Sequence, residues 1–137
     1  MRVLFALLLA IVLHGKAVAF TDADRASVQS AITQQLNAFL ADDGAAAYSF
    51  AAPSIQTMFP TQEVFMDLVR RGYQPVYRSR SHTFGELKET AGGVEQIVDI
   101  VDAGGEFWTA RYTLERQPDG TWKITSCMLL KKPGEVA

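Results

Sequence analysis

The stretch WTARYTLERQPDGTWKITSCMLL, residues 108–130, alternates apolar and polar side chains on either side of Pro118-Asp119-Gly120. Alternation with a period of two is typical of β-strands that bury one face, and the central three residues are turn formers. With these three residues as the loop, Gln117 is expected opposite Thr121. The stretch therefore predicts an antiparallel hairpin with one apolar face and one polar face.

This register assigns every side chain of the hairpin to a face. The even positions are expected to oppose one another on the apolar face, as Trp108–Leu130, Ala110–Met128, Tyr112–Ser126, Leu114–Ile124 and Arg116–Trp122. The odd positions form the polar face, where Glu115 lies opposite Lys123 and Cys127 lies beside Arg111. A shift of one residue would mix the two sets, so the pattern predicts that Met128 points into the core and Cys127 away from it.

Two more strands are predicted before this hairpin. The helical period gives way to alternation after Pro75, and the glycine pairs at 92–93 and 104–105 are turn signals. Strands are expected at about 76–88, 94–102, 107–116 and 121–131.

The first part of the chain has a helical period. Thr21 is a candidate N-cap with Asp24 three residues later, and apolar residues recur every three or four positions from Val28 to Leu40. We expect helices over 21–43, 45–52 and 61–72, with a further helical turn at 54–59. Helices followed by an antiparallel meander predict an α+β fold, with N-terminal helices packed on a curved four-stranded sheet.

That architecture, with an aromatic-rich inner face, resembles the nuclear-transport-factor-2-like, or cystatin-like, cone. Three segments resemble more narrowly the bacterial family called domain of unknown function 4864: FLADDGAAAYSFAAPSIQTMFPT (39–61), FMDLVRRGYQPVYR (65–78) and LERQPDGTWKITSCMLL (114–130). The resemblance covers nearly the whole chain after residue 19. It implies an exported protein with this fold, and it brings no established activity and no catalytic residue.

The first nineteen residues have the pattern of a secretory signal peptide. Arg2 is followed by an unbroken apolar run from Val3 to Leu13 and by the small residues Ala17-Val18-Ala19. The run is too short to span a bilayer. We expect residues 1–19 to be removed, leaving one domain over 20–137 that is periplasmic or secreted and has no membrane span.

Composition limits the chemistry of the chain. The net charge is -2, and loss of Arg2 and Lys16 with the signal makes it more acidic, which argues against nucleic acid as a partner. Cys127 is the single cysteine, and His82 is the single histidine after residue 19. Neither a Cys/His metal cluster nor an internal disulfide can form from these residues, so no metal and no cofactor are expected.

Asp99 is the candidate general base. Some enzymes of the cone architecture resemble ketosteroid isomerases, with an acid and hydrogen-bonding tyrosines inside the cone. One register of strand 94–102 faces Asp99 inward near Trp108 and Tyr112. The other faces Val94, Gln96, Val98 and Ile100 inward and leaves Asp99 outside. We favour the second because it buries more apolar residues and no lone carboxylate.

Two groups of residues are candidates for binding. Six side chains could line an apolar pocket at the open end of the cone: Tyr48, Met58, Phe59, Trp108, Tyr112 and Met128. Arg78, Arg80 and His82 fall on one face if the first strand begins at 76, and they could form a partner surface. The chain is therefore expected to be a non-catalytic exported module that binds a small apolar ligand or an envelope protein. The alternative is an isomerase- or hydrolase-type enzyme that uses Asp99 as base and Tyr112 or Tyr48 as hydrogen-bond donor.

Overall fold

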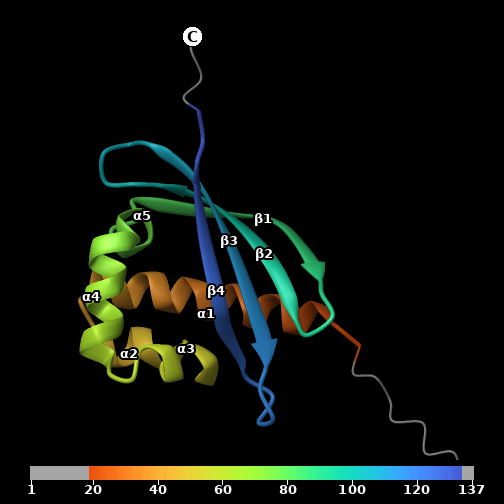
Figure 1. Ribbon diagram of the computed structural model, residues 1–137. Coiled ribbons are helices and arrows are strands. Elements are labelled where there is room, and N and C mark those ends of the chain that lie inside the picture. Colours follow the sequence, from red (N-terminus) through yellow and green to blue (C-terminus); the bar gives the residue numbers. More distant parts are fainter. Residues whose placement is uncertain (1–18, 134–137) are drawn as a thin grey trace, which may run out of the picture.

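The computed structural model describes residues 19–133, so almost all of the expected signal peptide lies outside the described residues. Helices come first and strands second, as the sequence predicts (Figure 1). The elements are α1 (Asp22–Leu40), α2 (Gly44–Ser49), α3 (Pro53–Met58), α4 (Gln62–Gly72), α5 (Gln74–Tyr77), β1 (Ser81–Glu89), β2 (Val94–Val101), β3 (Phe107–Arg116) and β4 (Trp122–Lys131). The four strands form one antiparallel sheet in the order β1-β2-β3-β4. No helix within residues 19–133 is both long enough and apolar enough to cross a membrane.

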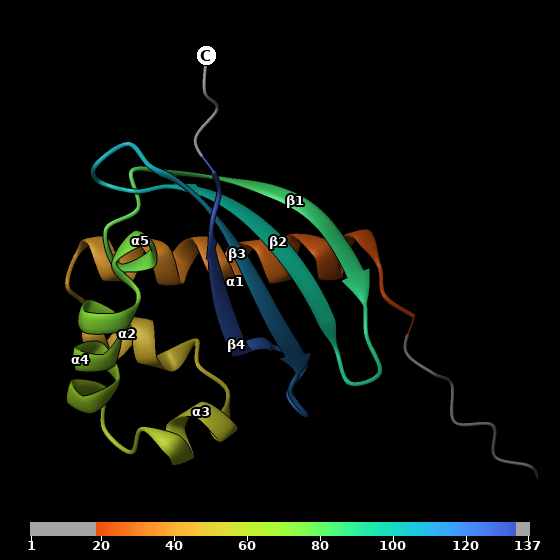
Figure 2. The same cartoon turned by 45° about the horizontal axis from the view of Figure 1, so that its top comes forward.

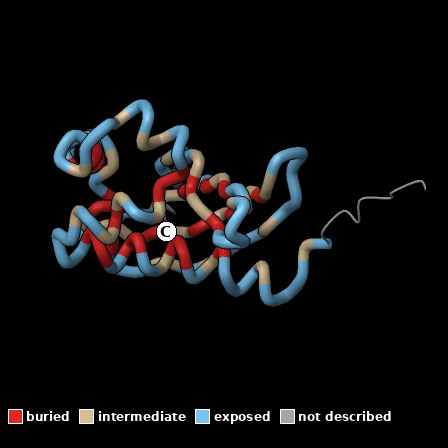
Figure 3. Tube along the Cα trace, turned by 90° about the horizontal axis from the view of Figure 1, so that it is seen from below, coloured by how far each residue is buried: buried red, intermediate tan, exposed pale blue. Residues whose placement is uncertain are grey.

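Helix α1 crosses the inner face of the sheet, and α2, α3 and α4 gather at one end of it (Figures 1 and 2). Thr21 and Asp24 form the expected capping box, in which each side chain accepts a hydrogen bond from the other residue's backbone amide. The predicted stripe of α1 is buried except for Leu40, which is 48% exposed, and buried positions gather in the interior of the molecule (Figure 3). The helix ends at Leu40 rather than at residue 43, because Asp42 has a φ of 52° and Asp43 caps α2.

The first strand begins later than the sequence predicts. Residues 74–77 form the short helix α5, with Pro75 in its first turn, and β1 starts only at Ser81. Pro75, Val76 and Tyr77 are all buried. The strand predicted to begin at residue 76 is therefore wrong over residues 76–80. The buried apolar residues of α5 also fit the alternation that is typical of a strand.

Strand β2 adopts the register that leaves Asp99 outside. Asp99 pairs with Thr109 of β3, and the side chains of Val94, Gln96, Val98 and Ile100 are buried. The loop between β2 and β3 contains more residues than Gly104 and Gly105, because the Asp102 amide donates to the Glu106 carbonyl at 2.9 Å and closes the loop there. The Asp102 carboxylate also accepts from the amides of Gly104 and Glu106, which stabilises this longer loop.

The last hairpin has the predicted register only near its turn. Arg116, Glu115 and Leu114 lie opposite Trp122, Lys123 and Ile124, as expected. A bulge at Thr125 then shifts β4 by one residue, and Thr113 contacts the hydroxyl groups of both Thr125 and Ser126.

Beyond the bulge, each side chain of β4 lies on the opposite face of the sheet from the predicted one. Tyr112 now pairs with Cys127, and Arg111 pairs with Met128. Met128 and Leu130 are consequently on the outer face, 54% and 49% exposed. The expected inward Met128 and outward Cys127 are both wrong for this reason.

The bulge lies beside a contact from the helical half of the chain. The segment between α2 and α3 pairs with the edge of β4, where the Ile124 amide donates to the Phe50 carbonyl and the Ala52 amide donates to the Ile124 carbonyl, each at 2.8 Å. This pairing fixes α3 near the inner face of the sheet, and the side chains between them enclose the candidate site.

Candidate functional site

An apolar cavity of about 340 Å³ lies between the inner face of β3 and β4 and the helices at the end of α1. Ile55 and Met58 of α3 and Phe65, Leu68 and Val69 of α4 form its helical side. The sheet side comes from Tyr112 of β3 and from residues 124–127 of β4. The cavity is partly open to solvent, and Met58, with 67% of its surface exposed, lies at its edge.

Helix α4 supplies the helical wall because its apolar residues share one face. Thr61 caps the helix by accepting a hydrogen bond from the Val64 amide, and Phe65 and Val69 follow on the buried face. The Phe65 ring packs against Phe39 and Tyr48, with centroids 6.2 and 5.4 Å apart. The position of this wall is thus set by aromatic packing against α1 and α2.

Tyr48 supports the cavity from behind. Its hydroxyl donates to the Phe59 carbonyl at 2.5 Å and lies 3.3 Å from the Gln56 carbonyl. These contacts tie the end of α3 to α2, so that Phe59 faces the cavity. The Tyr48 hydroxyl is engaged in the fold and is not free for a ligand.

Tyr112 is the buried polar residue of the sheet wall. Only 1% of its surface is exposed, and its hydroxyl has no oxygen or nitrogen hydrogen-bond partner among the described residues; the Cys127 thiol is the one acceptor beside it. Burial, together with the neighbouring Cys127, raises the pKa of Tyr112 well above its ordinary value. Because a thiol sulfur is only a weak acceptor, and an unsatisfied buried hydroxyl costs about 1–3 kcal/mol, this group could bind a stronger acceptor.

Cys127 lines the cavity beside Tyr112. Burial raises the pKa of the Cys127 thiol to about 12, so the thiol is protonated at neutral pH. A protonated, buried thiol is a poor nucleophile. The residue contributes shape and a weak sulfur partner to the cavity.

The cavity wall carries no ionisable acid or base of the ordinary catalytic kinds. Among the described residues that form it there is no Asp, Glu, His, Lys or Arg. Over residues 19–133 no three His, Cys, Asp or Glu side chains gather in a way that could hold a metal ion.

The six pocket residues expected from the sequence are only partly brought together. Met58, Phe59 and Tyr112 line the cavity, and Tyr48 lies directly behind it. Trp108 is elsewhere, with its indole nitrogen donating to Asp102 at 2.9 Å, and Met128 is on the outer face. The residues of α4 were not expected in the wall, although their apolar stripe is visible in the sequence.

Asp99 lies on the outer face of the sheet, away from both tyrosines. Its carboxylate accepts a hydrogen bond from Lys132 at 2.5 Å. An enzyme in which Asp99 works as base with Tyr112 or Tyr48 is therefore not supported by this geometry.

The three candidates for a partner surface do not share a face. Arg78 is bound into the fold: its guanidinium donates to the Phe39 carbonyl at 2.6 Å and to Asp42 at 2.7 Å. It also lies over the Tyr77 ring, 3.8 Å from the centroid. Arg80 is exposed.

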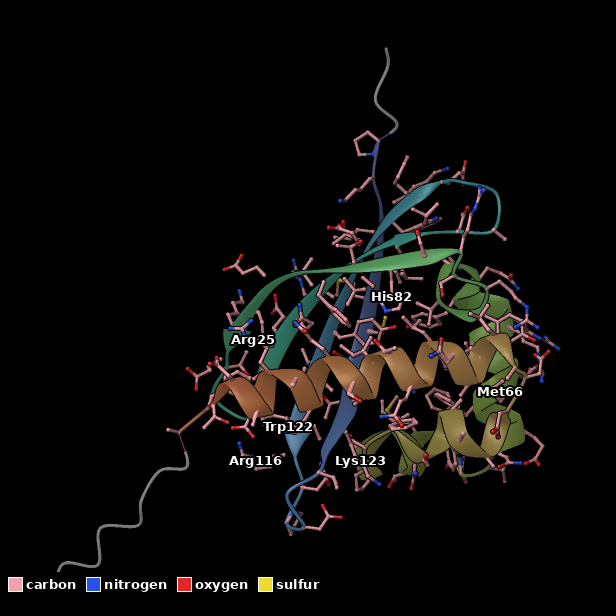
Figure 4. The ribbon with its side chains drawn as sticks, turned by 180° about the vertical axis from the view of Figure 1, so that it is seen from behind. Arg25, Met66, His82, Arg116, Trp122 and Lys123 are labelled. Atoms are coloured by element: carbon pink, nitrogen blue, oxygen red, sulfur yellow. The ribbon has the colours of Figure 1, made fainter. Side chains whose placement is uncertain are left out.

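His82 points the opposite way from the expected solvent face. It lies between β1 and α1, with its Nε2 3.2 Å from the Thr33 hydroxyl (Figure 4). Burial lowers the pKa of His82. The expected arrangement fails because Arg78 and Arg80 precede β1, and because His82 pairs with the inward-facing Ile100 of β2.

The comparisons with known proteins agree with the fold. A family model described as "Domain of unknown function (DUF4864)" matches residues 21–137. A crystal structure of an NTF2-like protein of unknown function from Shewanella baltica OS155 is similar, with a TM-score of 0.58 and 12% sequence identity. The similarity covers 82% of this chain and 96% of that one, and it shows an NTF2-like α+β fold. No curated protein matches the chain significantly.

Proposed function

This chain belongs to the DUF4864 family, and from that premise we propose that it is a non-catalytic module that binds a small apolar ligand in the cavity between the sheet and helices α3 and α4. The observation that carries the proposal is the cavity itself. Its volume of about 340 Å³ lies at the lower end of the range of small-molecule sites, and its wall is mainly aliphatic and aromatic.

The position of the cavity also supports binding. Helix α3 has no buried residue, so one side of the cavity is held by few packing contacts. The sheet side is rigid by comparison, because Tyr112 and Ile124 are buried within paired strands. A ligand could enter past α3 without disturbing the core, which is the arrangement expected of a binding site.

The catalytic alternative has less support. Asp99 is paired with Lys132 on the outer face, and the described wall supplies no carboxylate or imidazole in its place. Tyr112 alone can donate a hydrogen bond but has no base to work with.

Titration with N-phenyl-1-naphthylamine, a neutral apolar dye that fluoresces in apolar surroundings, tests the binding function. We expect the wild-type protein to bind the dye and Ile55→Trp, which fills the cavity from the unburied α3, to lose most of this binding. Met128→Ala, on the outer face, is the matched control and should bind as the wild type does. Equal binding by Ile55→Trp, with weaker binding by Met128→Ala, would place the dye on the sheet surface and refute the proposal.

We also propose that the module is exported to the periplasm or beyond. Support comes from the apolar run Val3–Leu13 and the small residues 17–19. The intact mass of protein recovered from the cell envelope should correspond to a chain that starts at Phe20. A full-length mass would contradict cleavage.

A further inference from the structure

We propose that the ligand of this cavity is an uncharged, mainly hydrocarbon molecule with one oxygen that accepts a hydrogen bond from the Tyr112 hydroxyl. Alcohols and ketones are the chemical class that fits. The inference rests on the proposed function, and it identifies the part of the ligand that the sheet wall would recognise.

Gln35, Thr125 and Ser126, three of the polar residues that line the cavity, already have partners within the fold. The Gln35 amide donates to the Ala47 carbonyl at 3.0 Å, and the hydroxyl groups of Thr125 and Ser126 contact Thr113. The Tyr112 hydroxyl, by contrast, is fully buried and has no oxygen or nitrogen partner among residues 19–133; its one neighbouring acceptor is the Cys127 sulfur, whose place a ligand oxygen would take. A buried polar group without a partner is uncommon in a folded protein, and one in a cavity wall is a candidate ligand contact.

The unused capacity of Tyr112 is that of a donor. Cys127, directly opposite on β4, offers only sulfur, which is a weak partner. Burial keeps the phenol protonated, since it raises the pKa of Tyr112. A ligand oxygen would accept the phenolic hydrogen more strongly than the thiol sulfur can.

A charged ligand does not fit the same wall. No charged side chain is among the described residues that line the cavity. A carboxylate or an ammonium group would lose its hydration on entry and find no opposite charge. The wall therefore selects against fatty acids and alkylamines in their ionised forms, although their hydrocarbon chains would fit.

The volume limits the size of the ligand. A cavity of 340 Å³ is roughly eleven times the volume of about 30 Å³ that one water molecule occupies in the liquid. Such a space, which is partly open to solvent, holds an eight-carbon molecule easily and leaves room for the larger dye. Eight-carbon probes are thus a suitable test series.

The test is displacement of N-phenyl-1-naphthylamine by 2-octanone, 1-octanol, 1-chlorooctane, octanoate and octylammonium at about pH 7. For the wild type we expect 2-octanone and 1-octanol to bind at least about 10-fold more tightly than the two ions. Tyr112→Phe keeps the ring and removes the hydroxyl. It should weaken 2-octanone by roughly 5- to 30-fold, the effect of one hydrogen bond, and leave 1-chlorooctane unchanged.

The thermal midpoint of unfolding provides a second readout. Without ligand, Tyr112→Phe should be as stable as the wild type or more so, because it removes a buried hydroxyl whose one acceptor is the weakly accepting Cys127 sulfur. With 2-octanone, the midpoint should rise more in the wild type than in the variant. Met128→Ala should behave as the wild type in both measurements.

The outcomes separate the two proposals. If the dye binds in the cavity but 2-octanone is no tighter than 1-chlorooctane, or if octanoate competes as well as the ketone, the ligand class is wrong while the binding function stands. If Tyr112→Phe leaves the ketone affinity unchanged, the hydroxyl contact is wrong. If the wild type binds neither the dye nor any eight-carbon probe, both proposals fail.

Discussion

Tyr112 of β3 lies opposite Cys127 of β4, and both side chains line the cavity. The bulge at Thr125 produces this pairing, because it inserts one residue into β4 between Ile124 and Ser126. The same residue turns Met128 outward. This bulge thus determines which side chains of β4 line the cavity and which face solvent.

The Cys127 thiol should react slowly in the folded protein. Burial raises its pKa to about 12, so at about pH 8 the thiolate that attacks iodoacetamide is scarce. We expect Cys127 to be alkylated on the order of 10³-fold more slowly in buffer than in concentrated urea. Mass spectrometry of samples taken over time measures the two rates. Equal rates in the two solutions would show that Cys127 does not face the interior.

Arg78→Ala should destabilise the fold. The guanidinium adds a second hydrogen bond to the Phe39 carbonyl at the end of α1 and pairs with Asp42, so its loss should cost about 1–3 kcal/mol in chemical denaturation. Arg71→Ala is the matched control, because Arg71 pairs only with Asp67 on the exposed face of α4. The control should change the free energy of unfolding by less than about 0.5 kcal/mol. Similar small effects for both arginines would contradict the capping role of Arg78.

Asp42 should make stability depend on pH in acid. The hydrogen bond from Tyr77, followed by contacts with Arg78, holds the pKa of Asp42 below its ordinary value of 3.8. A carboxyl group with a lowered folded-state pKa stabilises the fold above its unfolded-state pKa, and this contribution disappears as the pH falls through the folded-state value. In urea titrations the wild type should exceed Asp42→Asn in stability at about pH 6. The difference should shrink as the pH is lowered below about 3.8, and a constant difference would argue against the ion pair.

The two tryptophans should differ in their contribution to stability. Trp122 is 8% exposed and packs edge-on against Phe20, with ring centroids 5.8 Å apart. Trp122→Ala should therefore destabilise by about 3–5 kcal/mol. Trp108 is only partly buried, so Trp108→Ala should cost less than half as much. Thermal unfolding of the two variants side by side provides the measurement, and equal losses would contradict the different burial of the two rings.

Gln96→Leu should destabilise the pairing of β1 and β2. Gln96 is fully buried, and its amide donates to the carbonyls of Gly85 and Ile97 beside the irregularity in β1. Leucine has a similar size but leaves these carbonyls without a side-chain partner, at a cost of about 1–3 kcal/mol each. Gln29→Leu removes only the contact to Gln96 from a partly exposed position, so it should have a smaller effect. A neutral Gln96→Leu would show that water replaces the amide.

Much of the fold could be predicted because its signals are local. The capping box at Thr21, the apolar stripes of α1 and α4, and the Pro118-Asp119-Gly120 turn depend on neighbouring residues alone. The strand order of a meander then follows from short connections.

The cavity was less predictable because it depends on contacts between distant residues. Whether Met128 faces inward depends on the bulge beside Ile124, which is bonded to the segment between α2 and α3. Whether Arg78 is free depends on the Phe39 carbonyl at the end of α1, far away in the sequence. Alternation and charge in the sequence of one strand contain neither kind of information.

The hydrogen bonds of Ile124 with Phe50 and Ala52 make it possible to measure how often α3 separates from β4. Two amide protons, on Ala52 and Ile124, are held only by this contact between the helical half and the sheet. Their hydrogen–deuterium exchange should therefore follow the separation of α3 from β4, at a lower opening free energy than that of amides in the central strands. An occupant of the cavity should slow hydrogen–deuterium exchange at these two amides more than at the amides of the central strands.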